Sequence, residues 1–283
     1  MIAVTGASGQ LGRLAIRELL KSIPASQLIA IVRNPAKVSY LAEAGISVRQ
    51  ADYSDETALS NALNGAERLL FISSSEVGQR SAQHRHVINA ALSAGVKFIA
   101  YTSLLHADRS PLGLAAEHVE TEAMLAESGI PYALLRNGWY VENYLASLGP
   151  ALEHGVFIGC AGNGKIAAAP RADYAAAAAS VMTQDNPAGN VWELAADEGW
   201  TLSQLAEEAA RISGKPLVYR NLSEADYQAA LLGAGLPEGL AAMLANSDSG
   251  AAQGGLYDDS HQLSQLLGRP TIPLTQSLSA ALS

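Results

Sequence analysis

The chain has 283 residues, of which 49% are hydrophobic and 16% are charged, and its formal charge is −9 at pH 7. This composition excludes a disordered chain and a charged coil, and the length allows one large domain or two unequal ones. The acidic balance argues against a nucleic-acid partner and against binding to an anionic membrane surface.

The first expected element is a short apolar strand, Ile2–Val4, followed by a glycine-rich loop and a helix that extends to about Lys21. The loop consists of Gly6, Ala7, Ser8, Gly9, Gln10, Leu11 and Gly12. Its glycines permit a tight bend and a close approach to a pyrophosphate, whose charge faces the N–H groups at the helix start. Among 25 glycines the spacing alone is weak evidence, but its place between strand and helix predicts a dinucleotide-binding turn.

Arg33 follows the second expected strand, the apolar run 28–32. A carboxylate at this position would bind the ribose 2′-hydroxyl of NAD, whereas a cation suits the additional 2′-phosphate of NADP. Asn34 can cap the next helix with Pro35 at its first position, so the phosphate also meets a helix N-terminus near Lys37. We predict NADPH as the cofactor, with NADH used more weakly. The alternative is an ordinary surface arginine.

Apolar runs continue to alternate with helical segments through the first half of the chain. The later runs are Ile46–Arg49, Arg68–Ile72, Lys97–Tyr101 and Tyr132–Leu135. Gly95 and Gly129 are expected to end the helices that precede the last two strands. The alternation predicts an α/β fold, a Rossmann-type doubly wound parallel sheet with helices on both faces.

The alternation breaks after Arg136. We interpret 137–164 as a long excursion, and we expect a helix at Asp173–Met182, a strand at Val191–Leu194 and mostly helical structure from Thr201 onward. The predicted organisation is a Rossmann domain and a smaller, mostly helical substrate-binding lobe. The Rossmann domain comprises residues 1–136, completed by about 166–196, and the lobe comprises 137–165 and 197–283.

Ligands of open α/β sheets bind outside the carboxyl ends of the strands. Besides the glycine loop and Arg33, this rule selects polar residues after the later strands. They are Asp52 with Tyr53, then Ser73, Ser74 and Ser75, then Thr102 with Ser103, and finally Asn137, Gly138, Trp139 and Tyr140. We expect Asp52 to accept a hydrogen bond from an adenine amino group and the serines to contact ribose hydroxyls. For each serine, a solvated turn or a helix cap is an equal alternative.

The glycine loop, Arg33 and the stretches 73–80, 101–108 and 136–144 closely resemble the bacterial NAD(P)H:quinone oxidoreductases of type 2, which belong to the NmrA-like atypical short-chain dehydrogenases. The similarity covers essentially the whole chain. The resemblance implies a Rossmann domain, NADPH, and a small quinone as the substrate. It also implies that a set of residues lies near the nicotinamide or the acceptor. The set is Asn137, Gly138, Trp139, Tyr140, Val141, Glu142 and Arg171.

The chain lacks the Tyr-x-x-x-Lys proton donor of most short-chain dehydrogenases, because none of its ten tyrosines precedes a lysine by four residues. Hydride addition to a ketone leaves an alkoxide about 12 kcal/mol above its protonated form at pH 7, if its pKa is like that of water. Addition to a quinone leaves a phenolate-like anion only about 4 kcal/mol above its protonated form. The missing pair therefore favours a conjugated acceptor.

Placement of the acceptor against the nicotinamide is then the main task of the protein. Trp139 and Tyr140 are candidates for a wall that stacks on the quinone ring, and the alternative is that they pack between the lobes. Asn137 or Asn143 is expected to orient the nicotinamide amide or a quinone oxygen. We predict Tyr140 and Asn143 as the catalytic residues.

No metal site is expected. His84 and His86 are two residues apart on a helix and face different ways. His118 and Glu122 share a helix face, which we interpret as a solvated acidic surface rather than a zinc site. Cys160 is expected to be an exposed bystander thiol.

The single cysteine excludes an internal disulfide and is typical of a reducing compartment. No apolar run approaches the ~18 residues of a membrane span, and the first strand leaves no room for a signal peptide. We expect a soluble cytoplasmic protein, and a homo-oligomer is compatible with the sequence.

The leading interpretation is an NADPH-dependent quinone reductase that transfers two electrons by direct hydride transfer, without a flavin. The alternative is a non-enzymatic redox sensor of the NmrA type, which binds a nicotinamide dinucleotide without turnover. A weaker alternative is a reductase of another conjugated acceptor such as a dye.

Overall fold

Seven strands form the central sheet of the computed structural model, which describes the whole chain, Met1–Ser283. Their order is β3-β2-β1-β4-β5-β6-β8, and the neighbouring pairs from β3 to β6 are parallel. The strands are β1 (Ile2–Val4), β2 (Leu28–Val32), β3 (Ser47–Gln50), β4 (Arg68–Phe71), β5 (Phe98–Leu104), β6 (Tyr132–Asn137) and β8 (Val191–Leu194). The predicted Rossmann-type α/β fold is confirmed.

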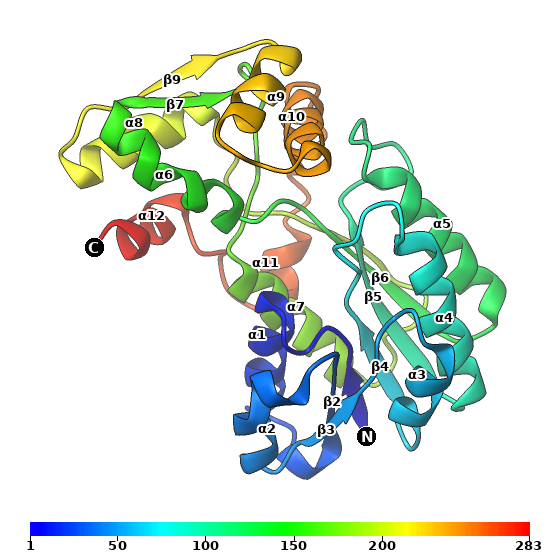
Figure 1. Cartoon of the computed structure of the whole chain (residues 1–283). Helices are drawn as coiled ribbons and strands as arrows, with labels where there is room; N and C mark the ends of the chain where they lie inside the picture. Colours follow the sequence, from blue (N-terminus) through cyan, green and yellow to red (C-terminus); the bar gives the residue numbers. More distant parts are fainter. The chain divides into compact units, whose positions relative to one another are not determined.

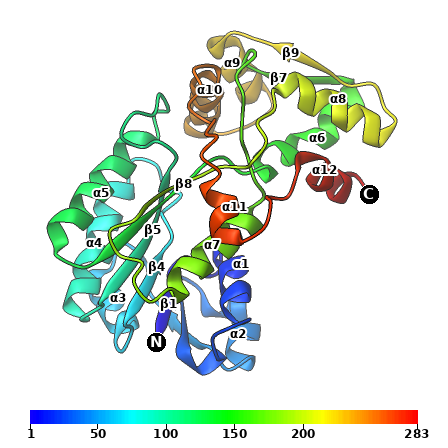
Figure 2. The ribbon, with the colours of Figure 1, turned by 180° about the vertical axis from the view of Figure 1, so that it is seen from behind.

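Helices cover both faces of this sheet (Figures 1 and 2). One face carries α1 (Gln10–Leu19), α2 (Ser39–Glu43) and α7 (Arg171–Thr183), and the other carries α3 (Glu56–Leu63), α4 (Arg80–Ser93) and α5 (Ala115–Ser128). Every residue of β1, β2 and β5 is buried as a result. Burial on both faces explains why these strands are continuous apolar runs in the sequence.

The helix ends follow the predicted signals. Gly95 and Gly129 have φ angles of 72° and 74°, and each lies just after a helix, α4 and α5 respectively. Asn34 caps η2 (Pro35–Val38), because its side chain accepts a hydrogen bond from the backbone N–H of Ala36 at 3.0 Å. The capped element is a 3₁₀ helix, and α2 follows it directly. A second 3₁₀ helix, η1 (Ala25–Gln27), precedes β2.

The chain divides into two units. The first comprises Met1–Leu104, Ala116–Asn137 and Arg171–Trp192, and the second comprises Leu105–Ala115, Gly138–Pro170 and Glu193–Ser283. A buried core of the first unit lies between the sheet and α3, α4 and α5, and Phe71 and Tyr101 are its largest side chains. The boundaries expected from the sequence for a Rossmann domain and a substrate-binding lobe stay a prediction.

The second unit contains a two-stranded parallel sheet, β7 (Val156–Gly159) with β9 (Val218–Asn221). Its helices are α6 (Glu142–His154), α8 (Leu202–Ser213), α9 (Glu224–Gly233), α10 (Glu238–Ala252), α11 (Gln262–Leu267) and α12 (Leu274–Leu282). The interpretation of 137–164 as an excursion was incomplete, because α6 and β7 lie within it. The sequence did not indicate α6 because Pro150, a residue that is disfavoured in helix interiors, lies within it. The strand β9 was missed because three of its four residues are exposed and one is half-buried.

None of the helices combines the length and the apolar character that crossing a membrane requires.

Candidate functional site

The glycine loop forms a tight turn at the carboxyl end of β1. Gly6 has a φ of +60°, in the left-handed region that favours glycine, and its carbonyl accepts a hydrogen bond from the N–H of Gly9 at 2.9 Å. A Cβ on Gly12 would lie 2.3 Å from the Gly6 carbonyl oxygen, so only glycine lets α1 pack this closely on the loop. These are the roles that a dinucleotide turn requires of its first and last glycines.

The start of α1 presents backbone donors. Gly9 is the N-cap and supplies no side-chain hydrogen bond to the first turn, in which no acidic residue lies. Gly9 and Gln10 are exposed, whereas Ala7 and Leu11 are buried and anchor the turn. The unsatisfied N–H groups and the positive end of the helix dipole together form a site suited to an anion.

Arg33 is exposed directly after β2, where the sequence places it. Its side chain is 68% exposed and its Nη1 donates to Oε1 of Glu76 at 2.8 Å. The backbone carbonyl of Arg33 accepts from Nε2 of Gln50 at 3.0 Å, which fixes the turn. The guanidinium is therefore accessible to a ligand, although a carboxylate already pairs with it.

Asp52 follows β3 and closes a local turn. Its Oδ1 accepts from the N–H of Ser54 at 2.9 Å and from the Ser54 hydroxyl at 2.6 Å, and these bonds lower the pKa of Asp52. One carboxylate oxygen is thus used by the turn. The expected contact with an adenine amino group stays a prediction.

Ser73, Ser74 and Ser75 follow β4, and side chains from neighbouring elements hold their backbone. The N–H of Ser73 donates to Thr102 Oγ1 at 2.8 Å, and the N–H of Ser74 donates to Nε2 of His84 at 2.9 Å. Ser74 is also fixed through its carbonyl, which accepts from Nε of Arg80 at 2.8 Å. The loop is therefore anchored in the core of the first unit rather than being a simple solvated turn.

His84 belongs to a buried network that sequence reasoning missed. Because its Nε2 accepts from an amide, its Nδ1 carries the proton that points to Thr121 Oγ1, 2.8 Å away. The hydroxyl of Tyr101 lies 2.7 Å from Nδ1 of His118. Burial lowers the pKa of His84 to about 2 and that of His118 to about 3, so both rings are neutral. The interpretation of His118 as part of a solvated face was wrong.

Glu122 lies on the same helix and is also largely buried. Arg136, near the end of β6, donates to its two carboxylate oxygens from Nε at 3.0 Å and from Nη2 at 2.7 Å. The hydroxyl of Ser103, near the end of β5, donates to Oε1 at 2.5 Å. The carboxylate thus takes three hydrogen bonds at the carboxyl edge of the sheet and is not a solvated charge.

Asn137 is the last residue of β6 and is 5% exposed. Its side-chain oxygen Oδ1 is buried and has no hydrogen-bond partner. A buried acceptor left in this way costs about 1–3 kcal/mol, so it indicates a place where a ligand donor belongs. Among the predicted site residues, Asn137 therefore carries direct evidence of an incomplete contact.

The predicted residues after Asn137 lie in the second unit. Gly138 donates its N–H to the carbonyl of Leu194 at 2.7 Å, and Trp139 and Val141 exchange backbone hydrogen bonds with Ala169. Tyr140 forms a parallel β-bridge with Ala169 and is half-buried. This pairing fixes the backbone from which the aromatic rings project.

Three further predicted residues begin helices. Glu142 and Asn143 are the first two residues of α6, and the N–H of Asn143 donates to the Tyr140 carbonyl at 3.0 Å. Arg171 is the first residue of α7 in the first unit and is half-buried. Each lies at a helix N-terminus, where backbone donors are unsatisfied by the helix itself.

Cys160 is buried, so the expectation of an exposed thiol was wrong. Its Sγ donates to the Ala245 carbonyl at 3.2 Å, and its N–H donates to Oδ2 of Asp248 at 2.9 Å. Burial raises the pKa of Cys160 to about 12 and that of Asp248 to about 6. The Cys160 thiol is therefore unreactive at neutral pH. In the same unit, the hydroxyl of Tyr144 is also buried and has no hydrogen-bond partner.

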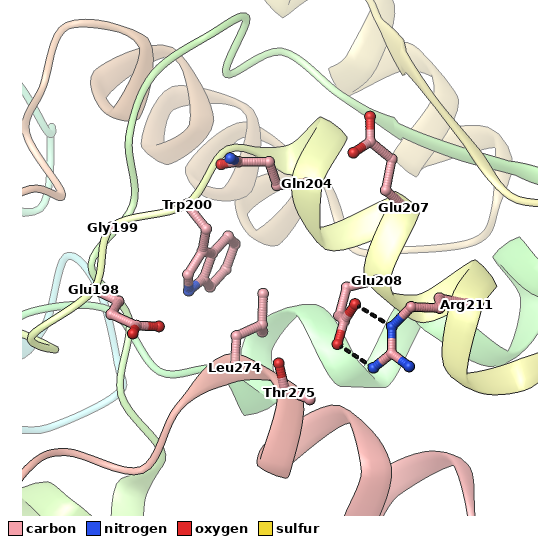
Figure 3. Close-up of a pocket in the computed structure, with 9 residues that line it drawn as sticks. All are labelled: Glu198, Gly199, Trp200, Gln204, Glu207, Glu208, Arg211, Leu274 and Thr275. Atoms are coloured by element: carbon pink, nitrogen blue, oxygen red, sulfur yellow. Dashed lines mark hydrogen bonds and ion pairs between the residues drawn. The ribbon is translucent and has the colours of Figure 1, made fainter.

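A cavity of about 480 Å³ lies within the second unit, between α8 and α12 (Figure 3). Glu198, Glu207 and Glu208 line it, and Arg211, its only cationic residue, pairs with Glu208 through bonds of 2.7 and 2.6 Å. The uncompensated carboxylates would repel an anionic dinucleotide. This cavity is therefore poorly suited to the dinucleotide that the sequence predicts at the glycine loop.

Comparison with known proteins agrees with this geometry. A family model described as NAD(P)H-binding matches residues 6–185, more than half of the chain. The chain belongs to the NAD(P)H-binding family. A protein of Escherichia coli strain K12 named Quinone oxidoreductase 2 is 67% identical over 279 residues, which are 99% of this chain and 98% of that protein. The resemblance to bacterial type 2 quinone oxidoreductases is confirmed.

Solved structures extend the similarity to the whole fold. The crystal structure of an NADPH-dependent quinone oxidoreductase from Escherichia coli, complexed with NADPH, is 66% identical, with a TM-score of 0.98 over all of both chains. A triphenylmethane reductase of Citrobacter sp., complexed with NADP(H), is 38% identical, with a TM-score of 0.96 over 99% of this chain and 100% of that one.

Proposed function

We propose that this protein reduces quinones to hydroquinones with NADPH, by direct two-electron transfer and without a flavin. The observation that carries the proposal is the 67% identity to the Escherichia coli quinone oxidoreductase over almost the full length of both proteins. The similarity to these proteins confirms the predictions of an oxidoreductase and of NADPH as its cofactor.

The residues present fit the cofactor. The glycine loop and the start of α1 would hold the pyrophosphate, because no side chain caps the first backbone N–H groups of this helix. The absence of a Cβ at Gly12 lets α1 pack closely on the loop. Arg33 would take the 2′-phosphate, with Asp52 at the adenine and Ser73, Ser74 and Ser75 at the ribose hydroxyls. The buried Oδ1 of Asn137 would accept from the nicotinamide carboxamide, which has the N–H donors that this oxygen lacks.

When bound, NADPH supplies the hydride. The chain has to orient the acceptor and exclude water. We assign Trp139 and Tyr140 to contact with the flat face of the quinone, and Asn143 to a quinone oxygen. Tyr140 and Asn143 are the proposed catalytic residues, while Gly138, Val141, Glu142 and Arg171 line the nicotinamide end.

The Tyr-x-x-x-Lys pair that supplies the proton in most short-chain dehydrogenases is absent from this chain. Glu122, on the helix that follows β5, accepts hydrogen bonds at both carboxylate oxygens from Arg136 and Ser103. A quinone needs such a donor far less than a ketone, since its reduced anion is only about as basic as tyrosinate. The proton of the hydroquinone would then come from solvent.

The test is the oxidation of NADPH and NADH against a panel of quinones, a triphenylmethane dye and a simple ketone. We expect turnover with quinones, faster with NADPH, and none with the ketone. The similarity to a triphenylmethane reductase makes the dye a second candidate acceptor. Tight NADPH binding with no turnover on any acceptor would instead identify a redox sensor.

Substitutions test the residue assignments. Arg33→Ala should abolish most of the preference for NADPH over NADH, and an unchanged preference would refute the assignment. Tyr140→Phe and Asn143→Ala should lower quinone turnover while leaving the Kd for NADPH within a few-fold. Tyr132→Phe, at the amino end of β6 and so at the opposite edge of the sheet, is the matched control.

The remaining proposals concern the setting of the protein. We propose a cytoplasmic location, because the chain has a single cysteine, which is buried, and no disulfide that would need an oxidising compartment. The substrate is a small-molecule quinone, and a homo-oligomer stays a prediction that size-exclusion chromatography with light scattering would test.

A further inference from the structure

Glu76 is the one acidic side chain that pairs with Arg33. Its Oε1 accepts from Nη1 of Arg33 at 2.8 Å, and its other oxygen, Oε2, accepts from Nε2 of Gln83 at 2.8 Å. Gln83 is 9% exposed and also accepts from the hydroxyl of Ser74. The carboxylate is thus fixed from the core side by a buried amide, while the side chain of Arg33 is 68% exposed.

The pair also has a defined place in the fold. Arg33 follows β2 and Glu76 lies in the loop after β4, and both strands are direct neighbours of β1 in the sheet. Side chains from these two loops can meet only across the carboxyl end of β1. The glycine loop starts at that end, so the ion pair crosses the edge to which the pyrophosphate is assigned.

We propose that Glu76 is a specificity-determining residue, which competes with the 2′-phosphate of NADPH for the guanidinium of Arg33. The inference rests on the proposed function, in which Arg33 receives that phosphate. A phosphate monoester carries about −1.5 to −2 charge at pH 7 and offers three acceptor oxygens, so it displaces a single carboxylate from the guanidinium. Gln83 retains Glu76 nearby, and the two anions then repel each other.

Competition has opposite consequences for the two cofactors. NADPH has to displace Glu76, so its affinity is lower than Arg33 alone would give. NADH has no 2′-phosphate, so Arg33 stays paired with Glu76 when NADH binds. Binding of NADH therefore does not leave the guanidinium of Arg33 without an anionic partner. Glu76 therefore reduces the preference for NADPH over NADH that Arg33 provides.

Two nucleotides without a nicotinamide isolate this effect from catalysis. Calorimetric titration with 2′,5′-ADP and with 5′-AMP compares ligands that differ only in the 2′-phosphate. For Glu76→Gln we expect about fivefold tighter binding of 2′,5′-ADP at low ionic strength, which corresponds to about 1 kcal/mol, the upper end for an exposed ion pair. Binding of 5′-AMP should change less than twofold, and high salt should reduce the gain in affinity for 2′,5′-ADP.

The control is Glu127→Gln, which removes an exposed carboxylate from the last turn of α5, at the opposite edge of the sheet. It should change neither Kd by more than twofold. In an Arg33→Ala background the gain from Glu76→Gln should fall below twofold, because there is no longer a guanidinium to compete for. Equal melting temperatures would show that each variant is folded.

Four results would overturn the proposal. Weaker binding of 2′,5′-ADP to Glu76→Gln would mean that Glu76 orients Arg33 for the phosphate instead of competing with it. Equal tightening of both nucleotides, or a gain that survives in the Arg33→Ala background, would exclude competition for the guanidinium. If Arg33→Ala itself leaves the ratio of the two affinities unchanged, the Arg33 assignment fails, and the role of Glu76 fails with it.

Discussion

Asp248 on α10 is a buried carboxyl group without a cationic partner in its surroundings. It is 6% exposed, and the N–H of Cys160 donates a hydrogen bond to its Oδ2 at 2.9 Å. The groups whose pKa it raises are acids as well, among them Tyr144, Tyr219 and Tyr227. Burial raises the pKa of Asp248 from 3.8 to about 6. At neutral pH the folded protein therefore has to hold an unfavourable buried charge.

The consequence for stability has a definite sign. The unfolded chain releases the Asp248 proton near pH 3.8 and the folded chain releases it near pH 6, so in this range the folded state binds more protons. The free energy of unfolding then falls as pH rises, and the full penalty is present above pH 6. A difference of about two pKa units corresponds to about 3 kcal/mol, of which about 2 kcal/mol develops between pH 4 and pH 7.

Asp248→Asn removes the charge and keeps an oxygen for the Cys160 N–H. Urea unfolding, followed by the fluorescence of Trp139 and Trp200 in the same unit, should show the variant gaining stability relative to the wild type by about 2 kcal/mol from pH 4 to pH 7. The histidines titrate identically in both proteins and cancel in the difference. Parallel curves would refute the argument, and the exposed Asp185→Asn should give them.

Three other changes test the first unit. Gly12→Ala would bring a Cβ to 2.3 Å from the Gly6 oxygen, so we expect a loss of about 1–3 kcal/mol in stability and at least about tenfold weaker NADPH binding, measured by melting and titration. His84→Gln should reduce the loss of stability on acidification, because the unfolded ring charges near pH 6.5 and the folded ring only near 2; an unchanged slope from pH 4 to 6 would contradict this. Arg136→Met should cost about 3–5 kcal/mol by leaving the Glu122 carboxylate buried without its partner, and Arg136→Met with Glu122→Leu should recover much of it in urea titrations.

The predictable part of the molecule is the part specified by local pattern. The apolar run 28–32 and the glycine spacing need no distant partner to be interpreted, and the strand–loop–helix order fixes their place at one edge of the sheet. Even the ends of α4 and α5 follow from single glycines with positive φ. For these elements of the first unit, the local sequence pattern was sufficient to predict the secondary structure.

Pairings between distant side chains were not predictable in the same way. Tyr101 and His118 are 17 residues apart and His84 and Thr121 are 37 apart, and nothing local indicates that these polar groups meet inside the core. A signal did exist for Arg136, since a cation at the carboxyl end of an otherwise apolar buried strand requires a partner. The partner, Glu122, is 14 residues away and was interpreted as solvated.

The buried pair of Arg136 and Glu122 bears on the chemistry as well as on the fold. It occupies the carboxyl edge near the ends of β5 and β6, and three donors already hold its carboxylate. A fixed, satisfied ion pair can stabilise and shape a site, but it cannot protonate a strongly basic alkoxide. The acceptor must then stabilise the negative charge that hydride addition leaves on it. A quinone does so, because its reduced anion is only about 4 kcal/mol above the protonated form at pH 7. By the same reasoning we expect turnover with conjugated acceptors and none with simple ketones, so the ketone control tests whether the protein supplies a proton to the reduced acceptor.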